Sequence, residues 1–178
     1  MIDAGLRVIE LTMRSAVAIE ALAAAKAEFG GAAHIGMGTI MTPDHLQASI
    51  DGGADFGVSP GLTPSLSAAI TASGLPFLPG VATVSEAMAA QDNGFRFLKF
   101  FPAEQAGGAA YLKSIGAVLP DITFCPTGGV NPDNAQGYLA LPNVGCVGTS
   151  SLTAMAAPGT YNRAEFQSKV AAHIPDTA

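Results

Sequence analysis

The sequence predicts an α/β fold in which parallel strands alternate with helices and close into a barrel of the TIM (β/α)8 type. Short β-like runs and alanine-rich helical stretches alternate along the 178 residues, which is typical of a parallel sheet covered by helices. Polar residues follow many of the β-like runs, and barrel enzymes gather functional groups at these strand ends. No Gly-x-Gly-x-x-Gly follows the first run, which disfavours a dinucleotide-binding open sheet.

Short apolar runs bounded by turn residues are the expected strands. They are Val8–Thr12, His34–Gly38, Phe56–Ser59, Phe77–Val81, Phe97–Phe100, Thr123–Pro126 and Val144–Gly148. The polar residues that follow them are Thr12, Arg14, Thr39, Ser59, Thr83, Lys99, Thr127, Thr149 and Ser150. We expect this ring of side chains to include the functional site.

Helix-like segments separate the strands. They are Ser15–Phe29, Pro43–Asp51, Thr63–Ser73, Val84–Asn93, Gly108–Leu119, Pro132–Ala140 and Tyr161–His173. Thr42-Pro43 and Asn131-Pro132 each place a capping side chain before a proline in the first helical turn. The glycines at Gly30-Gly31, Gly52-Gly53, Gly74 and Gly94 predict helix ends with a left-handed residue.

About seven βα units are present where a closed barrel has eight. Ile2–Leu6 resembles a helix end and a turn into a strand, so we expect the missing unit to be the first strand and helix of the barrel, whose place is ahead of Met1. The units present are expected to form a single domain over residues 1–178.

Composition narrows the class of protein. Charged residues make up only 12% of the chain and the net charge is −6, with eight scattered lysines and arginines, so a nucleic-acid partner is not expected. No apolar segment reaches the ~20 residues of a membrane span, and the N-terminus lacks a secretory pattern. We therefore expect a cytoplasmic protein that does not bind membranes.

Cysteines and histidines give no strong sign of a metal or cofactor. Cys125 and Cys146 each lie in a β-like run, and we interpret them as two buried thiols, with a redox or metal pair as the alternative. His34, His45 and His173 lack metal-ligand spacing. We expect neither a metal nor a cofactor.

Lys99 is the first candidate for chemistry, because it alone of the four lysines lies within a strand, between Leu98 and Phe100. Burial of an ammonium group costs several kcal/mol unless the group is paired or gives up its proton. A neutral amine can form a Schiff base with a ketone. The alternative is a structural lysine that reaches a carboxylate or the barrel mouth.

Two further motifs contain candidate site residues. In Val8–Arg14, Glu10 is a candidate proton shuttle and Arg14 a candidate carboxylate ligand, unless Glu10 forms a structural ion pair with Arg14 or Lys99. Gly128-Gly129, after one strand, and Thr149-Ser150, after the next, occupy the positions where barrels often bind phosphate. Ordinary turns are the alternative there.

These motifs together resemble those of the 2-keto-3-deoxy-6-phosphogluconate (KDPG) aldolase family, which also handles 4-hydroxy-2-oxoglutarate (KHG). The matching segments, in the family's order, are Val8–Arg14, Gly36–Thr39, Ser59–Gly61, Pro79–Thr83, Leu98–Glu104 and Phe124–Gly129. The resemblance implies a class I, Schiff-base aldolase on a TIM barrel, without metal or cofactor. It also implies a homotrimer and a small phosphorylated 2-keto acid as substrate.

The resemblance implies a role for each site residue. Lys99 would form the imine and Glu10 would move protons. Arg14 and Thr39 would hold the substrate carboxylate, and Pro60 and Phe101 would shape the pyruvyl pocket. Thr127 would bind near the imine, and Gly128, Gly129 and Ser150 would receive the phosphate.

The sequence departs from the family pattern in two places. The first strand and helix are missing, and Gly148–Ser151 lacks the second glycine and the aromatic residue that the family commonly has there. Two other functions are therefore alternatives: a catalytically silent, truncated barrel that still binds small anions, and another phosphate-binding barrel enzyme such as an epimerase or synthase.

Overall fold

The computed structural model describes residues 2, 5–152, 164, 167 and 168. The chain divides into two compact units. The N-terminal unit is Arg7–Lys99, and the C-terminal unit combines Met1–Leu6 with Phe100–Ala178. The boundary between them falls inside a strand, between Lys99 and Phe100. The predicted single domain over residues 1–178 stays a prediction.

Strands and helices alternate in the N-terminal unit, as predicted. Its elements are β1 (Val8–Thr12), α1 (Ala18–Phe29), β2 (His34–Gly38), α2 (Pro43–Asp51), β3 (Gly57–Val58), α3 (Pro64–Ser73), β4 (Phe77–Leu78), β5 (Gly80–Val81) and α4 (Val84–Asp92). The first four strands are parallel neighbours in the order β1-β2-β3-β4. Within the described residues, β1 is an edge strand of this sheet.

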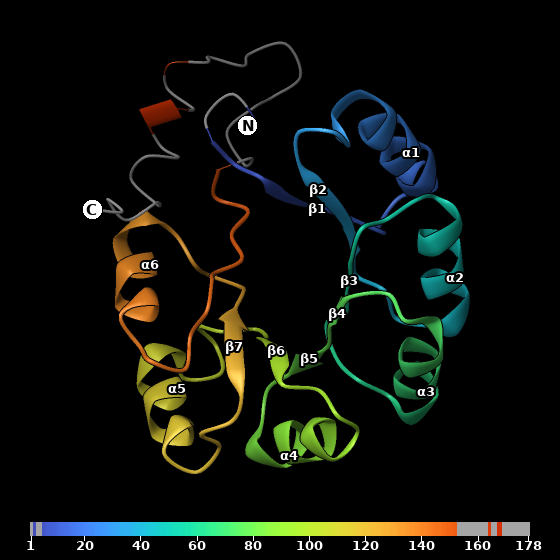
Figure 1. Cartoon of the computed structure of the whole chain (residues 1–178). Coiled ribbons are helices and arrows are strands. Elements are labelled where there is room, and N and C mark those ends of the chain that lie inside the picture. The colour runs from blue at the N-terminus through green and yellow to red at the C-terminus, as the bar shows by residue number, and fades with distance from the viewer. Residues whose placement is uncertain (1, 3–4, 153–163, 165–166, 169–178) are drawn as a thin grey trace. The chain divides into compact units, whose positions relative to one another are not determined.

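The core of the N-terminal unit lies between this sheet and helices α1, α2 and α3, which run beside its strands (Figure 1). Ile35 and Met37 of β2 are almost fully buried in it, together with Leu22 of α1, Leu46 of α2 and Leu66 of α3. Because side chains alternate across a strand, Gly36 and Gly38 lie on the other face of β2. On that face, Glu10 of β1 lies against Gly38.

The C-terminal unit holds the remaining regular elements. β6 (Phe97–Phe100) enters it at Phe100, and α5 (Gly108–Gly116), β7 (Thr123–Pro126) and α6 (Pro132–Leu139) follow. The hydrogen-bonded strand order is β5-β6-β7. The Phe100 ring stacks on Tyr111 of α5, with ring centroids 5.4 Å apart, and meets Phe124 of β7 edge-on at 6.5 Å.

Helix starts were predictable from local chemistry. Thr42 and Asn131 cap α2 and α6, and a proline follows each of them in the first turn. Thr83, which we expected in the ring of functional groups, instead caps α4 in a capping box with Glu86. Among the helix ends, Gly53, Gly74 and Gly94 are left-handed as predicted. The Gly30 prediction is wrong, because Gly30 has the right-handed φ of −60°.

Strand predictions hold with three differences. Phe77–Val81 splits into β4 and β5 at Pro79, which lacks the N–H needed for a ladder. Phe56–Ser59 shortens to β3. Val144–Gly148 is not a strand but makes two isolated parallel bridges, Phe124 to Val144 and Thr127 to Gly148. Of the predicted helix Tyr161–His173, only residues 164, 167 and 168 lie inside the described part, and they are helical.

None of the helices that the structure describes has the length and apolar character needed to cross a membrane.

Asp55 links two elements of the N-terminal unit. Its carboxylate accepts a hydrogen bond from Lys26 Nζ of α1 at 2.6 Å and one from the Ile35 N–H of β2 at 2.7 Å. Partial burial opposes the charge on Asp55, but Lys26 and the Ile35 N–H outweigh it and hold the pKa of Asp55 below its usual value. The charged form of Asp55 therefore stabilises the fold.

We expect Asp55→Asn to lower the free energy of unfolding at pH 7 by about 1–2 kcal/mol, because a charged acceptor with two donors is lost. A depressed pKa contributes stability above the unfolded pKa of Asp, and this is lost as pH falls through the folded value. The two proteins should therefore converge in acid. Urea unfolding of both proteins at pH 7 and in acid tests this. Asp51→Asn is the control, because Asp51 is exposed and accepts a hydrogen bond only from Gln47 of its own helix among the contacts described. The same loss at both pH values would contradict it.

Candidate active site

Lys99 occupies a buried position in β6, where its side chain is only 6% exposed. Its neighbours Leu98 and Phe100 are 0% and 1% exposed, and Phe100 packs against Tyr111 of α5. Side chains alternate along a strand, so Lys99 projects from the face opposite to Phe100. The strand position is fixed by a 2.9 Å hydrogen bond from the Lys99 N–H to the Pro79 carbonyl.

Glu10 lies on β1 opposite Gly36 of β2, and its carboxylate reaches the next glycine on that strand. A Cβ atom built on Gly38 would collide with Oε1, Cδ and Cγ of Glu10. The absence of a side chain at Gly38 therefore gives Glu10 its position. The ion pair that the described part of this unit shows is Lys26–Asp55. A structural ion pair of Glu10 stays an alternative interpretation.

Arg14, Thr39 and Pro60 follow the carboxyl ends of β1, β2 and β3, all in the N-terminal unit. Arg14 is exposed. Thr39 has a φ of +63°, which a β-branched residue rarely adopts. Such strain persists only where the surroundings impose it, and it is frequent at ligand sites. The carbonyl of Pro60 lies directly against Gly80, whose N–H donates to Ser59 Oγ at 3.3 Å.

The other five predicted site residues lie in the C-terminal unit. Gly128 and Gly129 form a turn after β7, with left-handed φ angles of +100° and +80°. A Cβ on Gly128 would come within 3.3 Å of the Phe101 ring, and Thr127 Oγ1 lies against Gly148. This turn places Phe101, Thr127 and both glycines together.

Ser150 is exposed in the loop after the bridge to Gly148. The preceding residue ties this loop to the glycine turn, because Thr149 Oγ1 donates to the Val130 carbonyl at 2.7 Å. The two predicted phosphate loops are therefore neighbours within one unit. Successive backbone N–H groups in a turn with left-handed residues can point at one anion and bind it.

The cysteines differ in exposure, so the prediction of two buried thiols is wrong for one of them. Cys125 is 7% exposed, whereas Cys146 is exposed. A hydrogen bond from Cys125 favours the thiolate of Cys146 and lowers its pKa to about 7. The parallel bridges on either side of them bring the two residues together. The sequence offered a redox or metal pair only as the alternative, and a hydrogen bond between the two thiols did not follow from their spacing.

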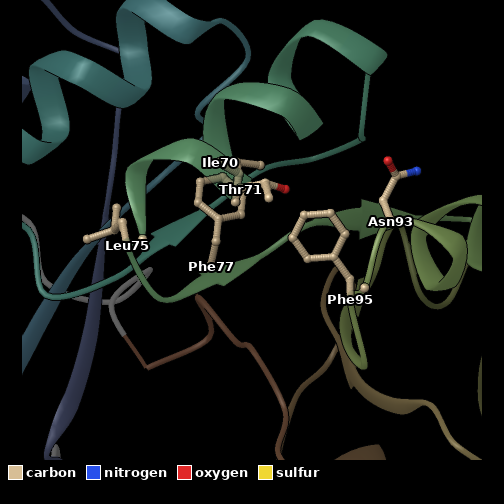
Figure 2. A pocket seen from close by; sticks show the side chains of 8 residues that line it. Ile70, Thr71, Leu75, Phe77, Asn93 and Phe95 are labelled. Atoms are coloured by element: carbon tan, nitrogen blue, oxygen red, sulfur yellow. The ribbon is translucent and has the colours of Figure 1, made fainter.

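A hollow of about 300 Å³ lies elsewhere in the N-terminal unit, between the end of α3, β4 and the turn after α4 (Figure 2). Figure 2 shows the Phe77 and Phe95 rings in its wall with Asn93 beside them. None of its lining residues is charged, and none is a predicted site residue. It lies at the start of β4, whereas barrel enzymes use the ends of their strands. We do not assign the site to it.

In the described part of the chain, no three His, Cys, Asp or Glu side chains lie close enough together to hold a metal ion. The predicted site residues offer an amine, a carboxylate and a guanidinium in the N-terminal unit, and backbone donors in the C-terminal unit.

Known proteins resemble this chain over most of its length. The model of the KDPG and KHG aldolase family matches residues 1–165. The KHG/KDPG aldolase of Escherichia coli (strain K12) is 41% identical over 165 residues, which are 92% of this chain and 77% of that protein.

Two crystal structures of relatives superpose closely. KDPG aldolase from Legionella pneumophila, with pyruvate captured as a covalent carbinolamine, is 45% identical with a TM-score of 0.83, over 85% of this chain and 73% of that one. KDPG aldolase of Zymomonas mobilis ZM4, with 3-phosphoglycerate, is 37% identical with a TM-score of 0.88, over 96% and 79%. These likenesses confirm the predicted α/β fold of the TIM-barrel type.

We expect Cys146 to react with iodoacetamide along a pH profile with a midpoint at about 7, below the usual thiol value of about 8.5. Cys125→Ala should raise that midpoint, because the donor that favours the thiolate is gone, whereas Cys125→Ser keeps a donor and should raise it less. Peptide mass mapping after short exposures gives the profile. A midpoint that Cys125→Ala leaves unchanged would contradict the hydrogen bond.

Proposed function

We propose that this chain, which belongs to the KDPG and KHG aldolase family, is a class I aldehyde-lyase that acts through Lys99. Its main reaction would be the cleavage of KDPG to pyruvate and glyceraldehyde 3-phosphate. It would also cleave KHG to pyruvate and glyoxylate. The observation that carries the proposal is a lysine almost fully buried in β6, at 6% exposure, within a family whose Legionella member was captured with pyruvate as a carbinolamine.

The reaction begins when the neutral amine of Lys99 attacks the C2 ketone and forms a carbinolamine. Loss of water gives a protonated imine, which withdraws electrons from the neighbouring carbons. The C4 hydroxyl then loses its proton, the C3–C4 bond breaks, and its electron pair moves into an enamine on Lys99. The leaving half departs as an aldehyde. Protonation at C3 and hydrolysis release pyruvate and restore the amine.

Glu10 is assigned the proton transfers of this sequence. A carboxylate can remove the C4 hydroxyl proton and return a proton to C3. Its place over Gly38 supports this role, because the space left by the glycine directs the carboxylate.

The substrate-binding roles are divided between the two units. In the N-terminal unit, the guanidinium of Arg14 and the strained Thr39 would hold the substrate carboxylate, and Pro60 would line the pyruvyl pocket. In the C-terminal unit, Phe101 would line that pocket and Thr127 would bind near the imine. Gly128, Gly129 and Ser150 would bind the phosphate, supported by the left-handed turn and the Thr149 hydrogen bond.

The wider setting is also proposed. The family resemblance leads us to expect a homotrimer that acts on a small phosphorylated 2-keto acid. From the charge and composition of the chain, we expect a cytoplasmic protein without a nucleic-acid or membrane partner. A relative from Zymomonas mobilis crystallised with 3-phosphoglycerate, which supports a phosphorylated ligand.

We expect borohydride reduction in the presence of pyruvate to leave a covalent adduct on Lys99, because the imine becomes a stable secondary amine. Peptide mass mapping locates it. Lys99→Arg should abolish the adduct, whereas Lys113→Arg, which changes an exposed lysine on α5, should not. A folded wild-type protein that forms no adduct would instead favour the catalytically silent barrel.

Glu10→Gln should lower kcat for KDPG by about 100-fold or more while changing pyruvate affinity little, since general acid–base catalysis contributes roughly 10²–10⁴-fold. Gly38→Ala should act in the same direction, because its methyl group takes the place of the Glu10 carboxylate. Glu20→Gln, on the exposed side of α1, is the control. Steady-state rates and pyruvate trapping together decide this, and equal losses in both would reject the proton-shuttle role.

A further inference from the structure

Glu104 ends the segment that follows β6, and this segment packs flat on the glycine turn after β7. The Ala103 N–H donates to the Thr127 carbonyl at 2.8 Å, and the Glu104 N–H donates to the Gly128 carbonyl at 3.1 Å. A Cβ on Gly129 would lie only 2.5 Å from Glu104 Cγ. The side chain of Glu104 therefore lies directly against the turn to which the phosphate is assigned. Nothing in the proposed reaction uses this carboxylate.

Tyr138 fixes the carboxylate of Glu104. The tyrosine is on α6, is only 1% exposed, and donates its hydroxyl proton to Glu104 Oε1. Burial and the adjacent carboxylate raise the pKa of Tyr138 above its usual value, so the hydroxyl stays a donor at every physiological pH. Gly108 lies beside the pair, and its φ of +62° is one that residues with a side chain rarely adopt.

Side chains at the start of helix α6 form hydrogen bonds with the same turn. Asn134 Nδ2 donates to the Gly129 carbonyl at 3.1 Å, and Asn131 Nδ2 donates to it at 3.3 Å. The turn is thus bound by the segment after β6 on one side and by α6 on the other. The contact between Tyr138 and Glu104 joins these two supports, across 34 residues of sequence.

A carboxylate so close to a phosphate site would oppose binding if it were free to turn toward the ligand. Two like charges a few ångströms apart repel each other, and the repulsion is stronger where water screens them less. Glu104 is itself exposed, so packing does not fix its carboxylate. Its hydrogen bond to Tyr138 does.

We propose that Tyr138 and Glu104 are positioning residues that determine the preference for a phosphorylated substrate, because Tyr138 holds the Glu104 carboxylate away from the phosphate bound at Gly128-Gly129. This inference rests on the proposed function. It concerns only the phosphate end of the substrate, so imine formation on Lys99 is independent of it.

The test compares two substrates in the Tyr138→Phe variant, which keeps the buried ring and removes only the hydroxyl. We expect KM for KDPG to rise about tenfold, equivalent to about 1.4 kcal/mol, with kcat little changed. KM and kcat for KHG, which has no phosphate, should stay within about twofold of wild type. Tyr111→Phe, on α5 of the same unit, should leave both substrates unaffected.

The double variant Tyr138→Phe with Glu104→Gln separates charge from structure. Removal of the negative charge should return KM for KDPG to within about threefold of wild type. The proposal is overturned if Tyr138→Phe raises KM equally for KDPG and KHG, or if it leaves both values unchanged. It is also overturned if adding Glu104→Gln does not lower the raised KM for KDPG. Pyruvate trapping on Lys99 is measured in every variant. A wild-type protein without an adduct refutes the proposed function, whereas normal trapping with an unchanged substrate preference refutes this inference alone.

Discussion

Glycines within the strands and just after them leave the space that the candidate site side chains occupy. The packing of side chains in each unit depends on this space. Glu10 lies over Gly38, Thr127 against Gly148, and Glu104 against Gly129. Glycines make space for apolar rings in the same way: the Phe56 ring packs on Gly36, and the Phe77 ring packs on Gly57. In each case a Cβ atom would collide with the neighbouring side chain. A large side chain can then lie flat against a strand or turn where a second side chain would force it away.

Local chemistry made much of the fold predictable. A capping side chain followed by proline fixes a helix start within a few residues, and Thr42-Pro43 and Asn131-Pro132 each begin a helix as expected. The failures have local reasons too. Thr83 belongs to a Thr-x-x-Glu capping box that its sequence displays, yet its place after a strand suggested a site residue. At Val144–Gly148, bridges form only at two separated points, and nothing in the apolar pattern distinguishes this from a full strand.

The candidate site was predictable only as far as residue type and strand position define it. Lys99 between apolar neighbours and Glu10 in a strand are visible in sequence, because a charged residue in such a run needs a reason. The contacts that orient them are not visible. Glu10 of β1 contacts Gly38 of the neighbouring strand β2, and Tyr138 contacts Glu104, 34 residues away in the sequence. No short motif contains either pair. Glu104 lies within Leu98–Glu104, one of the segments that match the family, but its partner lies on α6, the third element after it.

The separation of roles between the two units has a consequence for specificity. The proposed Schiff-base lysine, proton shuttle and carboxylate ligands belong to Arg7–Lys99, while the glycine turn and its supports belong to the segment from Phe100 onward. Binding energy from a part of the substrate that does not react can raise the rate when it orients the reacting part. In the proposed assignment, a phosphate held at Gly128-Gly129 would do this for KDPG, and KHG lacks that contact. The assignment therefore predicts that changes confined to the turn and its supports alter which keto acid is preferred, because they leave Lys99 and Glu10 unchanged.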